Sequence, residues 1–225
     1  MNKALVLPKG CLWHNLFYKR FPQFLSIILH PLLMPTIGIY LILNSGTHIS
    51  LLLPEAKKLI LIVTASGTFG LPIAFIPFFY YRKITTSIDI SEKHERIIPL
   101  LITASLYYLS FFLLHQMGVP MLIQAFLFAS AIAVMLTLLV TIKWKISAHL
   151  MGMGGIIGLI ITLSVLYHVN MFFYLMLFSL LAGFIGFARL SLNKHTPTQV
   201  YLGFISGLVV MVVTLILFHI SPVIF

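Results

Sequence analysis

Long apolar runs, separated by short polar links, make up most of this chain. A helix needs about 20 apolar residues to cross the hydrocarbon layer of a membrane. By this measure the predicted spans cover residues 22–44, 59–81, 98–116, 120–142, 149–167, 171–188 and 199–220, each boundary being approximate. The pattern therefore predicts an all-α, polytopic transmembrane helical bundle of six to seven spans, built as a single integral membrane domain over residues 1–225.

The first run leaves the number of spans open because Pro31 and Pro35 interrupt it. If this segment enters and leaves the membrane on the same side, only the later runs span it. The run is longer than the apolar core of a signal peptide, and no small-residue cleavage site follows it. We therefore expect a retained membrane segment rather than a cleaved leader.

The polar links differ greatly in length and content. Residues 115–120 and 168–170 leave room only for hairpin turns, whereas nearly all polar chemistry lies in residues 87–99, 143–155 and 189–200. Two predicted spans separate each of these three polar segments from the next, so all three emerge on the same membrane face. Because the number of spans between these segments is even, we predict one composite site built from all three links.

Composition agrees with a membrane protein. The chain is 60% hydrophobic and 8% charged, with a mean hydropathy of +1.10, whereas soluble domains carry about 25% charged residues. Its net charge of +10 would suggest nucleic acid as a partner of a soluble protein. Here the basic residues flank apolar spans, so we expect membrane lipids and a phosphorylated lipid substrate as partners, and no nucleic acid. The single cysteine, Cys11, excludes an internal disulfide.

The third polar segment has a structural interpretation that needs no chemistry. Thr196, Pro197 and Gln199 have the form of a capping box, with the threonine as N-cap and the glutamine at the third helical position. Arg189 could extend its charge to the membrane surface, as basic residues commonly do. This interpretation leaves His195, at the mouth of the same helix, without a role.

The second polar segment repeats this geometry. Ser147 is a plausible N-cap, and His149 stands at the start of the next helix, approached by Lys143 and Lys145. A helix N-terminus presents free N–H groups and the positive end of the helix dipole, which suit a phosphate. Small residues for close helix packing follow at Gly152, Gly154, Gly155 and Gly158.

The first polar segment carries three of the chain's four acidic residues. Pro99 marks a helix that begins just after Arg96. Lys93 and Arg96 are three residues apart, so they share a face if this turn is helical. A solvated loop with internal ion pairs is the alternative interpretation, and we prefer it for the glutamates.

The other histidines, including His30 before Pro31, lie within spans, near span ends or in links, and they form no recognisable motif. No His-x-x-Glu-His arrangement or Cys/His cluster occurs, so we predict no metal site and no cofactor. A Gly-rich phosphate loop is also missing, and no Ser/His/Asp arrangement points to a serine hydrolase.

The spacing of the third polar segment is specific. Arg189 is followed after five residues by His195 and after three more by Gln199, with Gly203 and Gly207 beyond them. This pattern resembles the third motif of the type 2 phosphatidic acid phosphatase superfamily, which reads Ser-Arg, five residues, His, three residues, Asp.

The other two segments resemble the remaining motifs of that superfamily less closely. Residues 146–149, Ile-Ser-Ala-His, match its second motif, Pro-Ser-Gly-His. Arg96 matches the arginine of its first motif, Lys, six residues, Arg-Pro, with Pro99 displaced by two positions. Asp89 stands where the family has lysine, so Lys93 is the substitute. The resemblance covers residues 80–210, which would form the phosphatase-like core.

The resemblance implies a metal-independent membrane lipid phosphatase that hydrolyses a lipid phosphomonoester or pyrophosphate. By it, His195 attacks phosphorus and forms a phosphohistidine intermediate, and His149 protonates the leaving oxygen. The resemblance also implies a set of phosphate-binding residues, namely Arg96, Lys93, Arg189, Ser147 and Lys145.

One departure keeps a second function open. Gln199 occupies the position of the family's aspartate, which orients the nucleophilic imidazole and stabilises its cationic form. Glutamine can orient the ring but is neutral, and the corresponding Asp-to-Asn change in serine proteases costs about 10⁴ in rate. The alternative is a non-catalytic lipid-phosphate binding or transport protein on the same fold. An ordinary transporter is less favoured, because it would place polar residues near the bilayer midplane, and here they lie at span edges.

Localisation follows from the spans, but orientation does not. We expect a multi-pass protein of the bacterial inner (plasma) membrane. With seven spans, the side of the N-terminus and the three polar segments carries seven basic residues besides Lys194 and the four of the candidate site: Lys3, Lys9, Lys19, Arg20, Arg82, Lys83 and Lys143. The opposite side carries Lys57 and Lys58, so the positive-inside rule places the site in the cytoplasm. The family resemblance instead favours the outer face.

Overall fold

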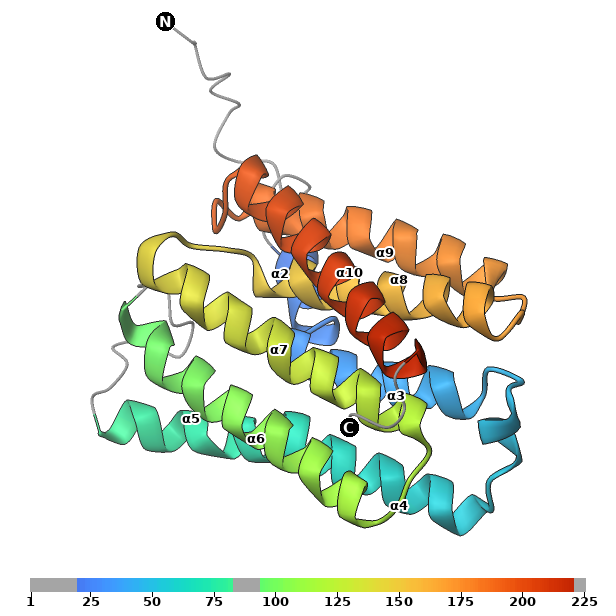
Figure 1. Cartoon of the computed structure of the whole chain (residues 1–225). Helices are drawn as coiled ribbons and strands as arrows, with labels where there is room; N and C mark the ends of the chain where they lie inside the picture. The colour runs from blue at the N-terminus through green and yellow to red at the C-terminus, as the bar shows by residue number, and fades with distance from the viewer. Residues whose placement is uncertain (1–19, 83–93, 221–225) are drawn as a thin grey trace, which may run out of the picture.

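The computed structural model describes residues 20–82 and 94–220 of the chain, which form helices and links without any strand. The long helices are α2 (Phe21–Ile28), α3 (Met34–Leu43), α4 (Pro54–Ala65), α5 (Leu71–Tyr81), α6 (Ile97–Gln116), α7 (Met121–Lys143), α8 (Ala148–Leu166), α9 (Phe172–Ser191) and α10 (Pro197–Ile220) (Figure 1). Shorter helical turns are η2 (Pro31–Leu33), η3 (His48–Leu51), the π-helical η4 (Ser66–Gly70) and η5 (His94–Arg96).

Seven segments within the described residues are long and apolar enough to cross a membrane, as many as the apolar runs counted in the sequence. They are Phe21–Leu43, Pro54–Phe79, Ile97–Gln116, Met121–Lys143, Ala148–Leu166, Phe172–Ser191 and Pro197–Ile220. The second begins five residues before its expected start, because Pro54 opens α4 and Glu55 follows in its first turn. Proline at the first helical position and an acid near the N-terminus both favour a helix start.

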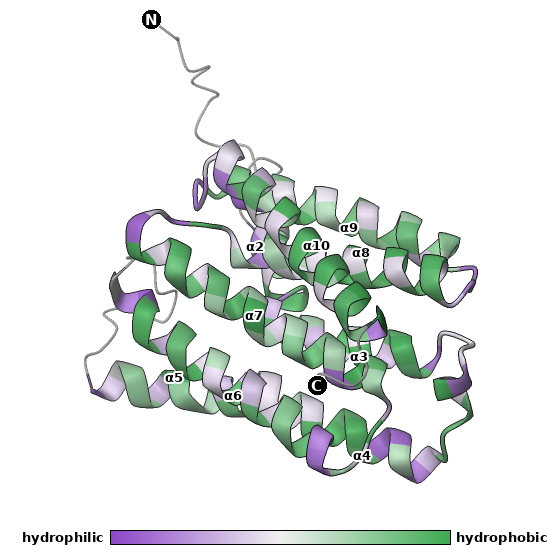
Figure 2. Ribbon diagram, in the orientation of Figure 1, coloured by the Kyte–Doolittle hydropathy of each residue, from purple (hydrophilic) through white to green (hydrophobic). Residues whose placement is uncertain are grey.

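The helices run side by side, so the links gather at two opposite ends of the bundle (Figure 1). One end holds residues 144–147 and 192–196 and the start of α6, and we call it the motif end. The other end, which we call the far end, holds residues 44–53, 117–120 and 167–171. Hydropathy follows this arrangement, because hydrophilic residues concentrate at the two ends while apolar residues cover the helices between them (Figure 2).

The first span is broken rather than continuous. α2 ends at Ile28, Leu29 and His30 are not helical, and η2 and α3 then continue towards the far end. Pro31 and Pro35 lack the N–H groups that an unbroken helix would require at these positions. α2 packs mainly on α9, whereas α3 packs among α4, α7 and α8.

The crossing of α8 and α10 brings the second and third polar segments together. A Cβ atom added at Gly154 would collide with the carbonyl of Phe204, and one at Gly207 would collide with the carbonyl of Met151. The backbones therefore touch, as predicted from the small residues of α8. At the motif end the Ser147 N–H donates to the carbonyl of Gln199 at 3.3 Å, so the starts of the two helices are directly joined.

Candidate functional site

A cavity of about 600 Å³ opens among the helices at the motif end and extends towards the middle of the bundle. It is lined by five of the residues predicted for the site, namely Arg96, Lys145, His149, Arg189 and His195. These side chains come from four places: the start of α6, the link before α8, α8 itself, and the end of α9 with the link behind it. The three polar segments therefore meet at one cavity, as the parity of the spans predicts.

Three predicted site residues stand apart from this lining. Lys93 lies outside the described residues. Gln199 does not line the cavity and reaches the site only through His195. Ser147 occupies the predicted N-cap position, but its side chain makes no capping hydrogen bond and is fully buried. Its hydroxyl has no hydrogen-bond partner among the described residues, so its predicted contact with phosphate stays a prediction.

His195 is held in one orientation by the capping box of α10. The Thr196 N–H donates to Gln199 Oε1 at 3.1 Å, and the Gln199 N–H donates to Thr196 Oγ1 at 3.5 Å, which confirms the predicted capping box. The backbone donor identifies the amide oxygen, so His195 Nδ1, 3.1 Å from the same Oε1, must carry the proton. His195 Nε2 therefore holds a lone pair.

The electrostatic surroundings keep the His195 ring neutral. Burial lowers the pKa of His195 to about 4, and the nearby charges of Arg96, Lys145 and Arg189 act in the same direction. The hydrogen bond to Gln199 opposes this shift and is outweighed. At neutral pH the side chain is thus an uncharged base surrounded by cations, which is the form that a nitrogen nucleophile requires.

His149 connects α8 with the first span and with α9. Arg189 Nη2 donates to His149 Nδ1 at 3.1 Å, so the ring proton lies on Nε2, 3.1 Å from the Ser26 carbonyl oxygen, to which it donates. Arg189 Nη1 also lies 3.5 Å from Ser26 Oγ. Both ring nitrogens of this buried histidine are therefore occupied. The general-acid role predicted for His149 stays a prediction, and it would require the bond to Ser26 to open.

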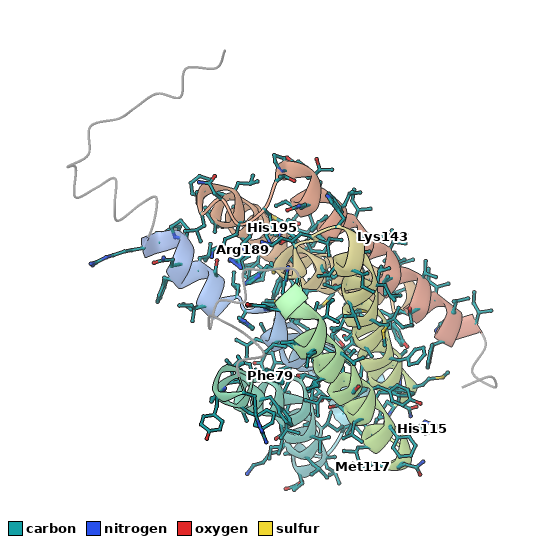
Figure 3. All side chains as sticks on the ribbon, turned by 90° about the vertical axis from the view of Figure 1, so that its left-hand side faces the viewer. Phe79, His115, Met117, Lys143, Arg189 and His195 are labelled. Atoms are coloured by element: carbon teal, nitrogen blue, oxygen red, sulfur yellow. The ribbon has the colours of Figure 1, made fainter. Side chains whose placement is uncertain are left out.

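Positive charge is concentrated on this side of the cavity. In Figure 3, which looks onto the motif end, Arg189 and His195 lie next to each other beside α2. Arg96 contributes from η5, directly before α6, and its buried Nη1 has no hydrogen-bond partner among the described residues. A buried guanidinium N–H without a partner is costly, so an anionic ligand at this position would stabilise the site.

The inner part of the cavity is apolar. Its walls there are formed mainly by aliphatic and aromatic side chains such as Ile156, Phe126 and Met211. Because Phe126 and Met211 lie well inside α7 and α10, the cavity runs from the polar links into the interior of the bundle. The arrangement can hold a molecule with an anionic head and an apolar tail.

Sequence reasoning missed the contribution of the first span. Gln23, Ser26 and His30 line the cavity, although the sequence motifs lie more than 60 residues later. The His30–Pro31 pair inside an apolar run was the available signal, because a polar residue at a helix break within a membrane commonly faces a cavity. No group of three His, Cys, Asp or Glu side chains able to hold a metal ion occurs in residues 20–82 and 94–220.

Comparisons with models of protein families, with curated proteins and with solved structures found no match to this chain. The resemblance to the type 2 phosphatidic acid phosphatases therefore rests on the three short sequence patterns and their spacing alone.

Proposed function

We propose that this protein is a metal-independent membrane lipid phosphatase that hydrolyses a lipid phosphomonoester or pyrophosphate through a phosphohistidine intermediate. The observation that carries the proposal is the cavity at the motif end, in which a neutral His195 with a lone pair on Nε2 stands among Arg96, Lys145 and Arg189. The apolar interior of the same cavity suits the hydrocarbon chain of a lipid.

The reaction would proceed in two displacements. His195 Nε2 attacks phosphorus, the bond to the leaving oxygen breaks, and that oxygen keeps the electron pair and takes up a proton. Water then attacks the phosphohistidine, the P–N bond breaks, and inorganic phosphate leaves with the neutral ring restored and one proton returned to the site. Arg96, Lys145 and Arg189 would stabilise the charge on the phosphoryl oxygens in both steps.

Phosphomonoesters and pyrophosphates differ in whether their leaving group needs a proton. An alcohol released from a phosphomonoester needs a proton in the transition state, whereas a phosphate released from a pyrophosphate can leave as an anion. His149 can supply that proton only if its bond to Ser26 opens. We therefore expect catalysis to depend on His149 more strongly for phosphomonoesters than for pyrophosphates.

A second function is favoured by the same contacts. Both nitrogens of His149 are occupied, and the partner of His195 is a neutral amide rather than a carboxylate. A protein with this arrangement can bind a lipid phosphate without hydrolysing it. Turnover therefore decides between a phosphatase and a lipid-phosphate binding or transport protein.

The deciding experiment uses the purified full chain in lipid vesicles. Phosphatidate, phosphatidylglycerophosphate, polyprenyl pyrophosphate and lipid A are presented in turn, and both released phosphate and bound lipid are measured in buffer with EDTA. Release that disappears in His195→Ala supports the phosphatase. Saturable binding without release supports the binding protein, and neither binding nor release of any of these lipids excludes both proposals.

We further propose a location in the bacterial inner membrane, with the motif end in the cytoplasm as the excess of basic residues suggests. Cysteine labelling tests this orientation. In a Cys11→Ser background, a Lys194→Cys variant reports on the motif end and a Leu51→Cys variant on the far end. An impermeant maleimide added to intact cells should label the far end; labelling at Lys194→Cys instead would place the site on the outer face.

A further inference from the structure

The break in the first span places a polar group inside the protein. Leu29 and His30 interrupt the helix within a segment long enough to span the membrane, and His30 has an extended backbone conformation (φ −66°, ψ 137°). Irregular backbone at membrane depth is tolerated where it is buried in protein or lines a cavity. His30 does line the large cavity, on the side formed by α2 and η2.

Its hydrogen bonding determines which ring nitrogen carries the proton. The Leu32 N–H donates to His30 Nδ1 at 3.3 Å and so caps the η2 turn. A backbone N–H can only donate, so Nδ1 is the acceptor and Nε2 bears the hydrogen of the neutral ring. His30 thus presents an N–H donor on the side of the ring away from the cap.

The neighbours of His30 are the groups that would hold a phosphate. The rings of His30 and His149 meet edge to face, with centroids 5.7 Å apart and planes 73° apart. Ser26, one turn earlier on α2, accepts from Arg189 and from His149. His30 therefore belongs to the same polar cluster as Arg189, the arginine of the third motif.

Capping alone does not account for a histidine at this position. Asparagine, serine or aspartate would accept from the Leu32 N–H without adding a second polar atom to the cavity. A polar group in a membrane-spanning segment is costly unless it finds a partner. The ring nitrogen beyond the cap therefore points to a ligand with acceptor oxygens.

We propose that His30 is a further phosphate-binding residue of this cavity, donating its Nε2–H to a non-bridging oxygen of the lipid phosphate that Arg189 and Arg96 bind. This inference rests on the proposed function, and it adds a contact from the first span that the three motifs do not contain. His30 binds in its neutral form and transfers no proton.

Two substitutions separate the cap from the phosphate contact, because each keeps one ring nitrogen. His30→Asn retains an acceptor near the position of Nδ1 and removes the donor at Nε2. His30→Gln retains a donor near the position of Nε2 and removes the short acceptor that caps η2. His115→Asn, at the far end, is the matched control because His115 does not line this cavity.

The measurement is the equilibrium binding of dioctanoyl phosphatidate to the full chain in detergent, with dioctanoylglycerol as the probe without phosphate. His30→Asn should weaken phosphatidate binding about ten- to hundredfold, as expected for one hydrogen bond to a charged group. His30→Gln should stay within about threefold of wild type but unfold at a lower temperature, because the cap is lost. Dioctanoylglycerol binding and the His115→Asn control should not change.

Two results would overturn this inference while leaving the proposed function intact: His30→Asn binding phosphatidate as wild type does, or both His30 variants losing it equally. The second result would show that the ring supports the fold and does not contact phosphate. Equal affinity of the wild-type chain for dioctanoyl phosphatidate and dioctanoylglycerol would also overturn the inferred contact between His30 and phosphatidate, and it would remove phosphatidate from the candidate ligands of the proposed function.

Discussion

The two ends of the bundle each carry a histidine–glutamine pair of nearly the same geometry. At the motif end, His195 Nδ1 lies 3.1 Å from Gln199 Oε1; at the far end, His115 Nδ1 lies 2.9 Å from Gln124 Oε1. In both pairs a backbone group orients the amide. The Thr196 N–H donates to Gln199, and Gln124 donates to the Val119 carbonyl at 2.6 Å.

The surroundings of the two pairs differ. His115 is exposed at the end of α6, and neither it nor Gln124 lines the large cavity. His195 lines that cavity, half-buried beside Arg96, Lys145 and Arg189. The same local pair therefore stabilises a hairpin at one end and presents a neutral nitrogen base to a cationic cavity at the other. The pair alone indicates no function; its neighbours do.

Removal of each histidine is the strongest test of this difference. His195→Ala should reduce phosphate release at least about a thousandfold, because the proposed nucleophile has no substitute in the site. His115→Ala should leave the rate within about twofold of wild type. The measurement is single-turnover phosphate release from vesicles that contain the best lipid substrate. Comparable losses in the two variants would show that the pairs do not differ in the proposed way.

The next test concerns the cations that distinguish the motif end. Arg189→Leu removes a proposed donor to phosphate and leaves His149 Nδ1 without its partner, so kcat/KM should fall about a hundredfold. Arg82, placed over the Phe78 ring at the end of α5, does not line the cavity and serves as the control. Arg82→Leu should change kcat/KM by less than about threefold. An equal effect of both variants would point to general attraction of anionic lipid rather than to a defined contact.

A negative charge added to each histidine–glutamine pair tests whether turnover depends on the pair that faces the cationic cavity. Gln199→Glu keeps the acceptor for the Thr196 N–H and supplies an anionic partner to His195. An anionic acceptor strengthens the hydrogen bond and stabilises the cationic ring, so turnover should rise about tenfold. Gln124→Glu should leave turnover unchanged. If Gln199→Glu gains nothing, a negative charge on the partner of His195 does not assist turnover.

The same variant makes a prediction about pH. The pKa of His195 is about 4 because burial and neighbouring cations disfavour its charged form. The neutral, nucleophilic form is thus complete at neutral pH and is lost only as the pH falls through about 4. Gln199→Glu should raise the pKa and move this loss to higher pH. Titration of the His195 ring resonance, identified by its absence in His195→Ala, measures both midpoints.

The smallest expected effect concerns the packing that supports the motif end. Gly207→Ala places a methyl group against the Met151 carbonyl, where α10 crosses α8, and should destabilise the protein by about 1–3 kcal/mol. Gly183→Ala, on α9 with open space at the added Cβ, should be neutral or slightly stabilising. The midpoint of thermal unfolding measures both. Equal midpoints would mean that the α8–α10 crossing tolerates a wider separation.

Local patterns in the sequence determined much of this protein. The spans follow from apolar length alone, because a helix in a membrane satisfies its own backbone groups. The number of spans between the polar links then placed those links at the same end. The capping box of Thr196 and Gln199 was also predictable, because its hydrogen bonds join residues three apart.

Only the tertiary structure determined which distant side chains contact the residues of these local motifs. His149 bonds the Ser26 carbonyl across 123 residues of sequence, and Arg189 reaches the Ser26 hydroxyl across 163. Spacing within a motif carries no information about contacts of that range, because helix crossings and backbone breaks set them. The residues around the cavity were therefore determined by the close approach of α8 and α10 and by the break at His30. These neighbours distinguish the His195 pair from the His115 pair.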